Sequence, residues 1–199
     1  MAQDKDAQLQ YLIMTLVRLG AATPDEIGYM IYHRERLYKQ LDYVLRIPGI
    51  YYAERVLVLG ESVPWVGLFL GPYKKVTSID LTSKRIWGEI ECFDMDMNAP
   101  HPVTGTWPVI VACEILEHLK DPAETCQWIR DHTEPGGHLM ISVPLFEEEN
   151  DPNHRHNNLD KDIIHGWLGG PTKWKSVWVE YDVYNHRTPT VTMCFEKVG

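Results

Sequence analysis

The chain has 199 residues and a mass of 23.0 kDa, which suits one domain with a sizeable hydrophobic core. Hydrophobic residues make up 44% of it and charged residues 24%, which is the ordinary balance of a soluble globular protein. The formal net charge of −9 disfavours a broad surface for phosphates, so it argues against a nucleic-acid partner.

The N-terminal residues and the cysteines bear on localisation. The first residues are too polar for a signal peptide, and no apolar run is long enough to span a bilayer. The four cysteines, Cys92, Cys113, Cys126 and Cys194, form no CxxC pair. This pattern favours structural thiols in a reducing compartment. We therefore expect a cytoplasmic protein with no membrane partner.

The first 50 residues predict helices. Apolar side chains recur at helical spacing over residues 7–19. A second helix is predicted from Thr23 to about Arg46, because Thr23, Pro24 and Glu26 fit a capping box with proline at the first helical position. From the residues alone, these helices pack on the rest of the domain.

Short apolar runs rich in β-branched residues predict buried strands in the next part of the chain. The runs are residues 55–59, 109–113 and 138–143; residues 75–80 predict a further strand, and residues 89–93 alternate in polarity like another. Between the last two runs, Asp121 and Pro122 fit the N-cap and first position of a helix that continues to about Thr133. A strand, a helix and a strand in this order predict parallel pairing with a right-handed crossover.

The last 55 residues of the chain predict a loop, a helix and a hairpin. Residues 145–158 are polar without a regular period, as is common for a loop that covers a substrate site. A helix begins at about Leu159 and ends at Gly169-Gly170-Pro171. Residues 174–183 and 190–196 alternate in polarity, so they predict two strands joined as a hairpin.

Titratable residues gather where the predicted strand 109–113 ends. Glu114, Glu117 and His118 follow it directly, at the end of a strand where open α/β sheets bind ligands. These groups, with His154 from the later loop, could hold a divalent metal. An imidazole, with an ordinary pKa of about 6.5, could instead take a proton from an acceptor hydroxyl. The plainer alternative is that His118 caps the following turn.

Asp80 is the second candidate from the residues alone. It ends the predicted strand 75–80 and follows Gly60 by about 20 residues, the spacing at which an acid accepts hydrogen bonds from a ribose. The alternative is a cap for the next turn, because Thr82 and Ser83 come after it.

The segment Glu114 to Leu119 reads Glu-Ile-Leu-Glu-His-Leu, and a helix, Pro135-Gly136-Gly137 and a strand follow it. This order resembles the class I S-adenosylmethionine (SAM)-dependent methyltransferases, whose fourth strand often ends in Glu-x-x-Glu-His-Leu. The resemblance implies an α/β, Rossmann-like, doubly wound sheet of seven strands, mostly parallel, with a C-terminal antiparallel hairpin. It also implies a helical cap or lid over residues 1–50 and a Rossmann domain over residues 51–199.

The same resemblance implies a SAM site along the ends of the first strands. In the family, a glycine-rich loop follows the first strand, and an acid after the third strand contacts the adenine amino group. That acid often lies in Asp-Leu-Asn, so Asp96 of Asp96-Met97-Asn98 is preferred over Asp94. The implied cofactor-binding residues are Gly60, Glu61, Ser62, Asp80, Leu81, Asp94, Asp96, Met97 and Glu114.

The glycine-rich loop departs from the family pattern Asp/Glu-x-Gly-x-Gly-x-Gly. Gly60 keeps the first glycine, whereas Val58 replaces the acid and Ser62 and Pro64 replace the later glycines. Because proline lacks an N–H and fixes φ, the loop must take another shape. This departure leaves cofactor affinity open.

Two groups of the resembling family use Glu-x-x-Glu-His to hold a metal that activates the acceptor hydroxyl. They are the quinone-biosynthesis O-methyltransferases and the small-RNA 3′-end 2′-O-methyltransferases. Many other relatives carry the motif with no known metal, so a metal is not favoured here. If one binds, its candidate ligands are Glu114, Glu117, His118 and His154. The implied catalytic residues are His118, as base or ligand, then His154 and Glu117.

The resemblance therefore implies a SAM-dependent methyltransferase that acts on a small molecule, with a hydroxyl as the preferred acceptor. One alternative is a binding or regulatory protein on the same fold that no longer turns over. A further alternative is a metal-assisted RNA 3′-end 2′-O-methyltransferase. An Asn-Pro-Pro-Tyr segment, used for base amines, is absent after the strand 109–113, which disfavours DNA-base and protein-glutamine acceptors.

Overall fold

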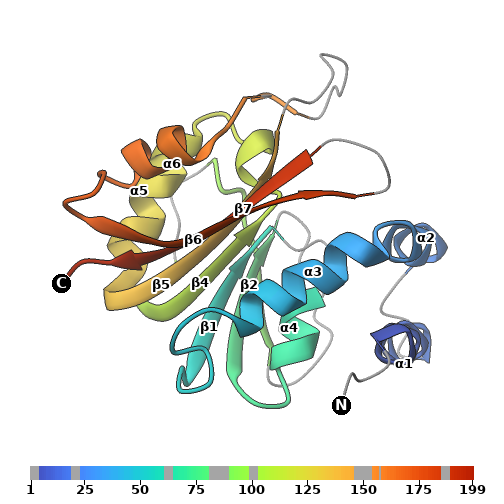
Figure 1. The fold of residues 1–199 in the computed structure, drawn as a ribbon. Coiled ribbons are helices and arrows are strands. Elements are labelled where there is room, and N and C mark those ends of the chain that lie inside the picture. The colour runs from blue at the N-terminus through green and yellow to red at the C-terminus, as the bar shows by residue number, and fades with distance from the viewer. Residues whose placement is uncertain are drawn as a thin grey trace.

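A seven-stranded sheet forms the centre of the molecule (Figure 1). The structure is a computed structural model that describes residues 5–18, 23–60, 65–80, 90–98, 103–145, 154–156, 158–184 and 189–199. The strand order is β3-β2-β1-β4-β5-β7-β6. The strands are β1 (Arg55–Leu59), β2 (Lys75–Asp80), β3 (Ile90–Asp94), β4 (Trp107–Cys113), β5 (Thr133–Pro144), β6 (Trp174–Val183) and β7 (Pro189–Lys197).

Pairing in the sheet confirms the predicted topology. Strands β1 to β5 pair in parallel, and β7 pairs antiparallel with both β5 and β6. The strands β1 and β4 and residues 139–144 of β5 are almost entirely buried, which explains why their sequences are mostly apolar. The strand order reverses between β1 and β4, so the carboxyl ends of these two strands flank the switch point where such sheets bind ligands.

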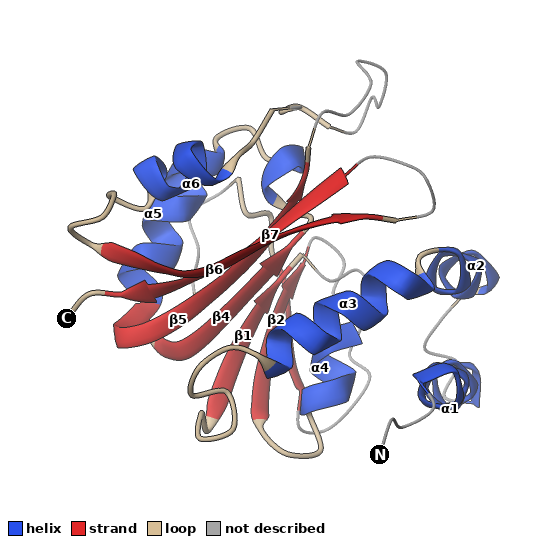
Figure 2. Cartoon of the chain, viewed as in Figure 1, coloured by secondary structure: helices blue, strands red, loops and turns tan. Residues whose placement is uncertain are grey.

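Helices cover both faces of the sheet, as expected for a doubly wound fold (Figure 2). The helices α5 (Pro122–His132) and α6 (Lys161–Trp167) lie on one face, and α3 (Arg34–Leu45) and α4 (Trp65–Leu70) lie on the other. Each face has its own core of buried apolar side chains. None of the helices in the described ranges is long and apolar enough to cross a membrane.

The predicted second helix is two helices, which corrects the sequence interpretation. The capping box of Thr23 and Glu26 is present at the start of α2 (Pro24–Tyr32), but the helix stops at His33 and α3 begins at the next residue. His33 has φ −95° and ψ 14°, outside the helical region, while the apolar spacing continues across it. The rings of Tyr29 and Tyr32 pack against its imidazole at this corner.

Helix α3 is packed onto the sheet by both apolar and polar contacts. Its buried residues include Leu37 and Val44, which belong to the same core as strands β1 and β4. The Tyr43 hydroxyl donates a hydrogen bond to Asp182 on β6, and Arg46 lies 2.7 Å from Glu180 on the same strand. The helix α1 (Lys5–Arg18) contributes the buried Leu16 to this core. The lid function of these helices remains a prediction.

Helix and strand boundaries elsewhere follow the local sequence. Asp121 caps α5 by accepting a hydrogen bond from the Glu124 N–H, and Asp160 caps α6 in the same manner. The sequence placed the end of α5 at about Thr133, but the helix ends at His132 and β5 already begins at Thr133. The hairpin residues 185–188 lie outside the described ranges.

The buried cysteines give a first testable prediction. Burial raises the pKa of both Cys126 and Cys194 to about 12, so almost no reactive thiolate exists at about pH 8. We expect both thiols to resist maleimide in the native protein and to react rapidly in guanidinium chloride. Peptide mapping by mass spectrometry measures the labelling at each residue. Rapid labelling of either cysteine in the native state would contradict its buried position.

Candidate functional site

The carboxyl ends of β1 and β4 meet at Gly60 and Ile115. Gly60 follows β1 with a φ of +78°, and its N–H donates to the carbonyl of Ile79 on β2. An ideal Cβ built on Gly60 would lie only 2.7 Å from the Ile115 Cβ. The backbone after β1 therefore passes so close to the segment after β4 that only glycine fits there.

Glu114 is the first residue of the site after β4. It has a φ of +53°, the only positive value among the non-glycine residues that the structure describes. Its N–H donates to the Ser142 carbonyl, and its carboxylate Oε1 accepts a 2.9 Å hydrogen bond from the Ser142 hydroxyl. Strand β5 thus holds both the backbone and the side chain of Glu114 at the edge of the sheet. Strain of this kind is common where a side chain serves a ligand site.

Arg36 of α3 occupies the other side of the Glu114 carboxylate. Its Nη1 donates to Glu114 Oε2 at 3.2 Å, and its Nη2 donates to the Tyr29 hydroxyl. Burial alone would lower the pKa of Arg36, yet the negative charge of Glu114, with contributions from Tyr29 and Glu117, raises it overall. The ion pair is about 15% exposed on each side, so solvent screens it only weakly.

Sequence reasoning did not find Arg36. The residue is 78 positions from Glu114, and no motif links the two. One signal was available: Arg36 lies four residues before Gln40, seven before Tyr43 and eight before Val44, all of which are buried. A charged residue on the inward stripe of an amphipathic helix is expected to have a specific partner.

Glu117 is the most unusual group of the site. Its side chain is 1% exposed, and neither carboxylate oxygen has a hydrogen-bond partner among the described residues. Burial raises the pKa of Glu117 well above its usual range, the nearby charge of Glu114 raises it further, and Arg36 offsets only part of this. An ionised carboxylate at this position therefore calls for a cationic partner.

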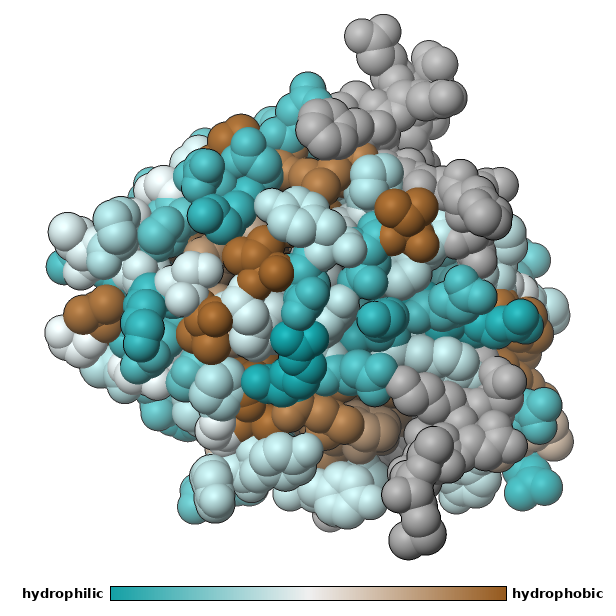
Figure 3. Space-filling model, in the orientation of Figure 1, coloured by the Kyte–Doolittle hydropathy of each residue, from teal (hydrophilic) through white to brown (hydrophobic). Residues whose placement is uncertain are grey.

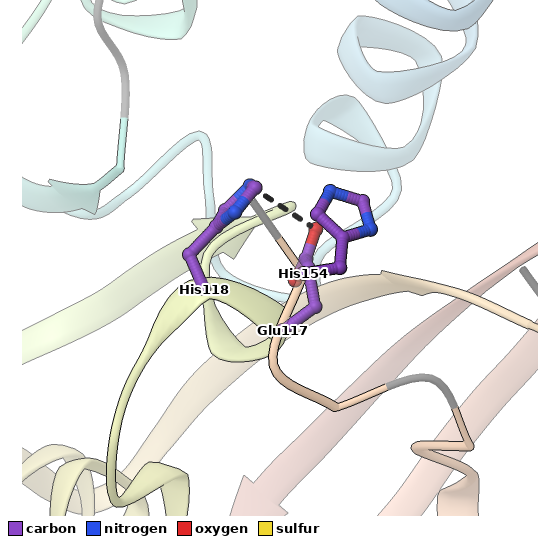
Figure 4. A group of neighbouring side chains, drawn as sticks. All are labelled: Glu117, His118 and His154. Atoms are coloured by element: carbon purple, nitrogen blue, oxygen red, sulfur yellow. Dashed lines mark ion pairs between the residues drawn. The ribbon is translucent and has the colours of Figure 1, made fainter. Parts of the chain in front are cut away.

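Two imidazoles face Glu117 (Figure 4). The short helix η1 (Leu116–His118) brings His118 Nε2 to 3.9 Å from Glu117 Oε1, and the rings of His118 and His154 lie edge to face at 4.5 Å. One ligand atom from each of Glu117, His118 and His154 lies within 4.8 Å of the other two. Burial lowers the pKa of His154, as do the charges of His118 and Arg36, which favours its neutral form.

Backbone hydrogen bonds hold the histidine segment in place. The N–H groups of Arg155 and His156 both donate to the Glu117 carbonyl, at 2.7 and 3.3 Å. The His156 Nε2 lies 3.0 Å from the Leu119 carbonyl. His156 therefore anchors the segment, whereas His154 points its ring at the cluster (Figure 4).

Four of the implied cofactor residues lie at or just after the ends of β2 and β3: Asp80, Asp94, Asp96 and Met97. Asp80 pairs in register with Asp94, and its carbonyl accepts a 2.8 Å hydrogen bond from the Met95 N–H. Asp96 Oδ1 accepts hydrogen bonds from both the backbone N–H and the side-chain amide of Asn98, so this acid also orders its own turn. Met97 is buried in the core.

Several predicted contacts stay predictions. Glu61, Ser62 and Leu81 lie outside the described residues, and of Asp94 only the backbone is described. Pro64, which replaces a family glycine, also lies outside the described residues. The structure thus brings together Glu114, Glu117, His118 and His154 at the end of β4, with Gly60 and Asp80 on the neighbouring strands.

Comparison with protein families decides the classification. A family model described as a methyltransferase domain matches residues 64–186, more than half of the chain. The chain belongs to this methyltransferase family. A comparison with curated proteins gives no match. The suspected membership of the class I SAM-dependent methyltransferases is confirmed.

Solved structures of methyltransferases share the fold. The N-methyltransferase NodS from Bradyrhizobium japonicum WM9, in complex with S-adenosyl-L-homocysteine, has a TM-score of 0.69 and 16% identity over 98% of this chain and 99% of its own. A SAM-dependent methyltransferase from Clostridium acetobutylicum ATCC 824 has a TM-score of 0.62 and 10% identity over 88% of this chain and 99% of its own.

The family fold also occurs in a protein with another activity. The [4+2]-cyclase SpnF has a TM-score of 0.58 and 12% identity over 73% of this chain and 75% of its own. At these identities the likeness shows the fold alone. The reaction of this methyltransferase-family chain must therefore be argued from its own site.

Proposed function

We propose that this methyltransferase-family protein binds SAM at the ends of β1 and β2 and transfers its methyl group to a hydroxyl of a small molecule. The observation that supports it best is the side-by-side position of two sets of groups. Gly60 and Asp80 lie at the ends of strands β1 and β2, and the Glu117, His118 and His154 cluster lies past the neighbouring β4. A methyl donor on the first set would face an acceptor on the second.

The proposed reaction is an in-line displacement. The acceptor oxygen attacks the sulfonium methyl, the new C–O bond forms as the C–S bond breaks, and sulfur keeps the electron pair as a thioether. The acceptor hydroxyl would lose its proton to the Glu117, His118 and His154 cluster, where an imidazole can act as a general base. Because SAM supplies a good leaving group, the protein mainly aligns the two reactants and excludes water.

The remaining groups have supporting roles in this proposal. Asp80 would accept hydrogen bonds from the ribose hydroxyls. Glu114, fixed by Arg36 and Ser142, would form the edge of the cofactor site next to the acceptor. We also propose that the protein works in the cytoplasm, in keeping with the buried free thiols of Cys126 and Cys194.

A second candidate is a binding protein on the same fold without turnover. Two observations favour it: Ser62 and Pro64 replace loop glycines, and Arg36 already occupies the carboxylate of Glu114. The net charge of −9 gives less support to an RNA acceptor. Binding of SAM separates these candidates, because the first requires it.

The corresponding prediction concerns Asp80. In calorimetric titration with SAM, we expect Asp80→Ala to weaken binding about 10- to 100-fold, because hydrogen bonds to a charged carboxylate contribute about 1.5–3 kcal/mol. The control is Asp131→Ala, whose carboxylate is 63% exposed and pairs with the neighbouring Arg130. We expect this control to bind SAM as the native protein does.

Titration of the native protein with SAM decides between the two candidates. Micromolar binding of SAM that weakens in Asp80→Ala but not in Asp131→Ala would support the enzyme and justify a screen of hydroxylated acceptors. No binding at millimolar SAM would overturn the enzyme proposal and leave the binding protein.

A further inference from the structure

The Glu117, His118 and His154 cluster has the composition of a metal-binding site. Glu117 carries two buried carboxylate oxygens without hydrogen-bond partners in the described part of the chain. Buried carboxylates in folded proteins are almost always paired, hydrogen-bonded or bound to a metal. The two groups that lie closest to this carboxylate in the cluster are imidazoles, which are metal ligands in their neutral form.

We propose that Glu117, His118 and His154 bind one divalent transition-metal ion, such as zinc or cobalt, and leave coordination positions open for the acceptor. Two imidazoles and one carboxylate form a donor set typical of zinc and related ions. Magnesium and calcium prefer oxygen ligands throughout, so this donor set does not suit them.

Glu114 is not part of this proposed ligand set, although it belongs to the same sequence motif. Its two oxygens are already bound, Oε1 to the Ser142 hydroxyl and Oε2 to Arg36. It contributes in another manner: its negative charge neutralises Arg36, which would otherwise repel a cation from the neighbouring cluster. The structure thus assigns different tasks to the two glutamates.

The geometry requires only small side-chain movements. The three ligand atoms lie within 4.8 Å of one another, whereas bonds of about 2.0–2.1 Å in a tetrahedral site place ligand atoms about 3.3 Å apart. The backbone that carries the ligands is fixed, because the Glu117 carbonyl accepts the N–H groups of Arg155 and His156. The His118 side chain is 42% exposed, so it has room to rotate toward the other two ligands.

A metal ion bound here would also take part in the proposed methyl transfer. A hydroxyl that binds at an open position of the metal loses its proton more readily, because the cation stabilises the alkoxide. The two histidines would then act as ligands, and the proton would pass to solvent. This role rests on the proposed methyl transfer, whereas metal binding itself does not.

The test is a titration of the full chain, freed of metal by dialysis against a chelator, with Co²⁺ and then Zn²⁺. We expect intense visible absorption bands from four- or five-coordinate Co²⁺, about one ion per chain, and their loss when Zn²⁺ displaces it. We also expect Zn²⁺ to raise the melting temperature by mass action. No SAM is present, so failure here does not depend on the methyltransferase reaction.

Variants localise the ion. Glu117→Gln keeps the shape of the side chain, and His118→Asn changes a partly exposed one, so both should fold. We expect each to weaken Co²⁺ binding at least about tenfold, because even lost outer-shell partners cost this much. The control, His165→Asn, removes an imidazole on α6 that contacts the Trp174 carbonyl and the Phe195 ring, and this variant should bind Co²⁺ as the native protein does.

Two outcomes would overturn the metal site. One is the absence of Co²⁺ absorption bands in the native protein. The other is binding that Glu117→Gln and His118→Asn leave unchanged, because the ion would then lie elsewhere. Titration with SAM in metal-free buffer tests the proposed function separately.

Discussion

Gly60→Ala is expected to lower the free energy of unfolding by about 2–5 kcal/mol. Alanine at the φ of +78° costs about 1–2 kcal/mol, and the new Cβ would lie 2.7 Å from the Ile115 Cβ. Forcing an additional methyl group into a packed site costs about a further 1–3 kcal/mol. Because Ile115 follows Glu114 directly, its displacement should also weaken SAM binding.

Gly49→Ala is the matched control for this prediction. Gly49 has the same φ of +78°, but no atom lies within 4 Å of an ideal Cβ there. We therefore expect a loss of only about 1–2 kcal/mol, since only the backbone conformation is penalised. Urea unfolding of both variants measures the difference. Equal losses would show that the contact with Ile115 is relaxed at little cost and would contradict the close approach of the two segments.

Arg36→Gln is expected to lower the free energy of unfolding by about 2–4 kcal/mol. Removing one partner of a buried ion pair leaves the other charge uncompensated, which costs about 3–5 kcal/mol when burial is complete. The side chains of Arg36 and Glu114 are 16% and 15% exposed, so we expect a loss of stability toward the lower end of that range. The loss should be larger than for a surface pair because Arg36 also faces Glu117.

Arg55→Gln supplies the comparison for Arg36. Arg55 lies 3.1 Å from Glu134, but these side chains are 49% and 35% exposed. Solvent-exposed pairs contribute about 0–1 kcal/mol, so this variant should unfold almost as the native protein does. A loss for Arg36→Gln as small as that for Arg55→Gln would mean that Glu114 does not depend on Arg36.

Most of the fold followed from the local sequence. The β-branched runs such as Val109–Cys113 predicted the strands, and capping residues such as Thr23 and Asp121 predicted helix starts. The helix break at His33 was missed because the apolar spacing continues across it, whereas the rings of Tyr29 and Tyr32 contact its imidazole only in the folded corner. Side-chain contacts of this kind are not encoded in periodicity.

The candidate site was predictable only in part. Glu114, Glu117 and His118 are adjacent in the chain and follow a buried strand, so the sequence alone determined that they gather at a ligand-binding edge. It also determined the order of the elements and the apolar faces that build the sheet. Local sequence carries this information because periodicity and caps act over a few residues.

Tertiary structure alone decided the electrostatics. It brought Arg36 from α3 to Glu114, placed His154 next to His118, and buried the Glu117 carboxylate without a hydrogen-bond partner among the described residues. The two glutamates of one motif thereby differ: one is neutralised by Arg36, and the other has a pKa raised by burial. Burial and distant charges depend on where the whole chain packs, so no stretch of sequence could have assigned these separate roles.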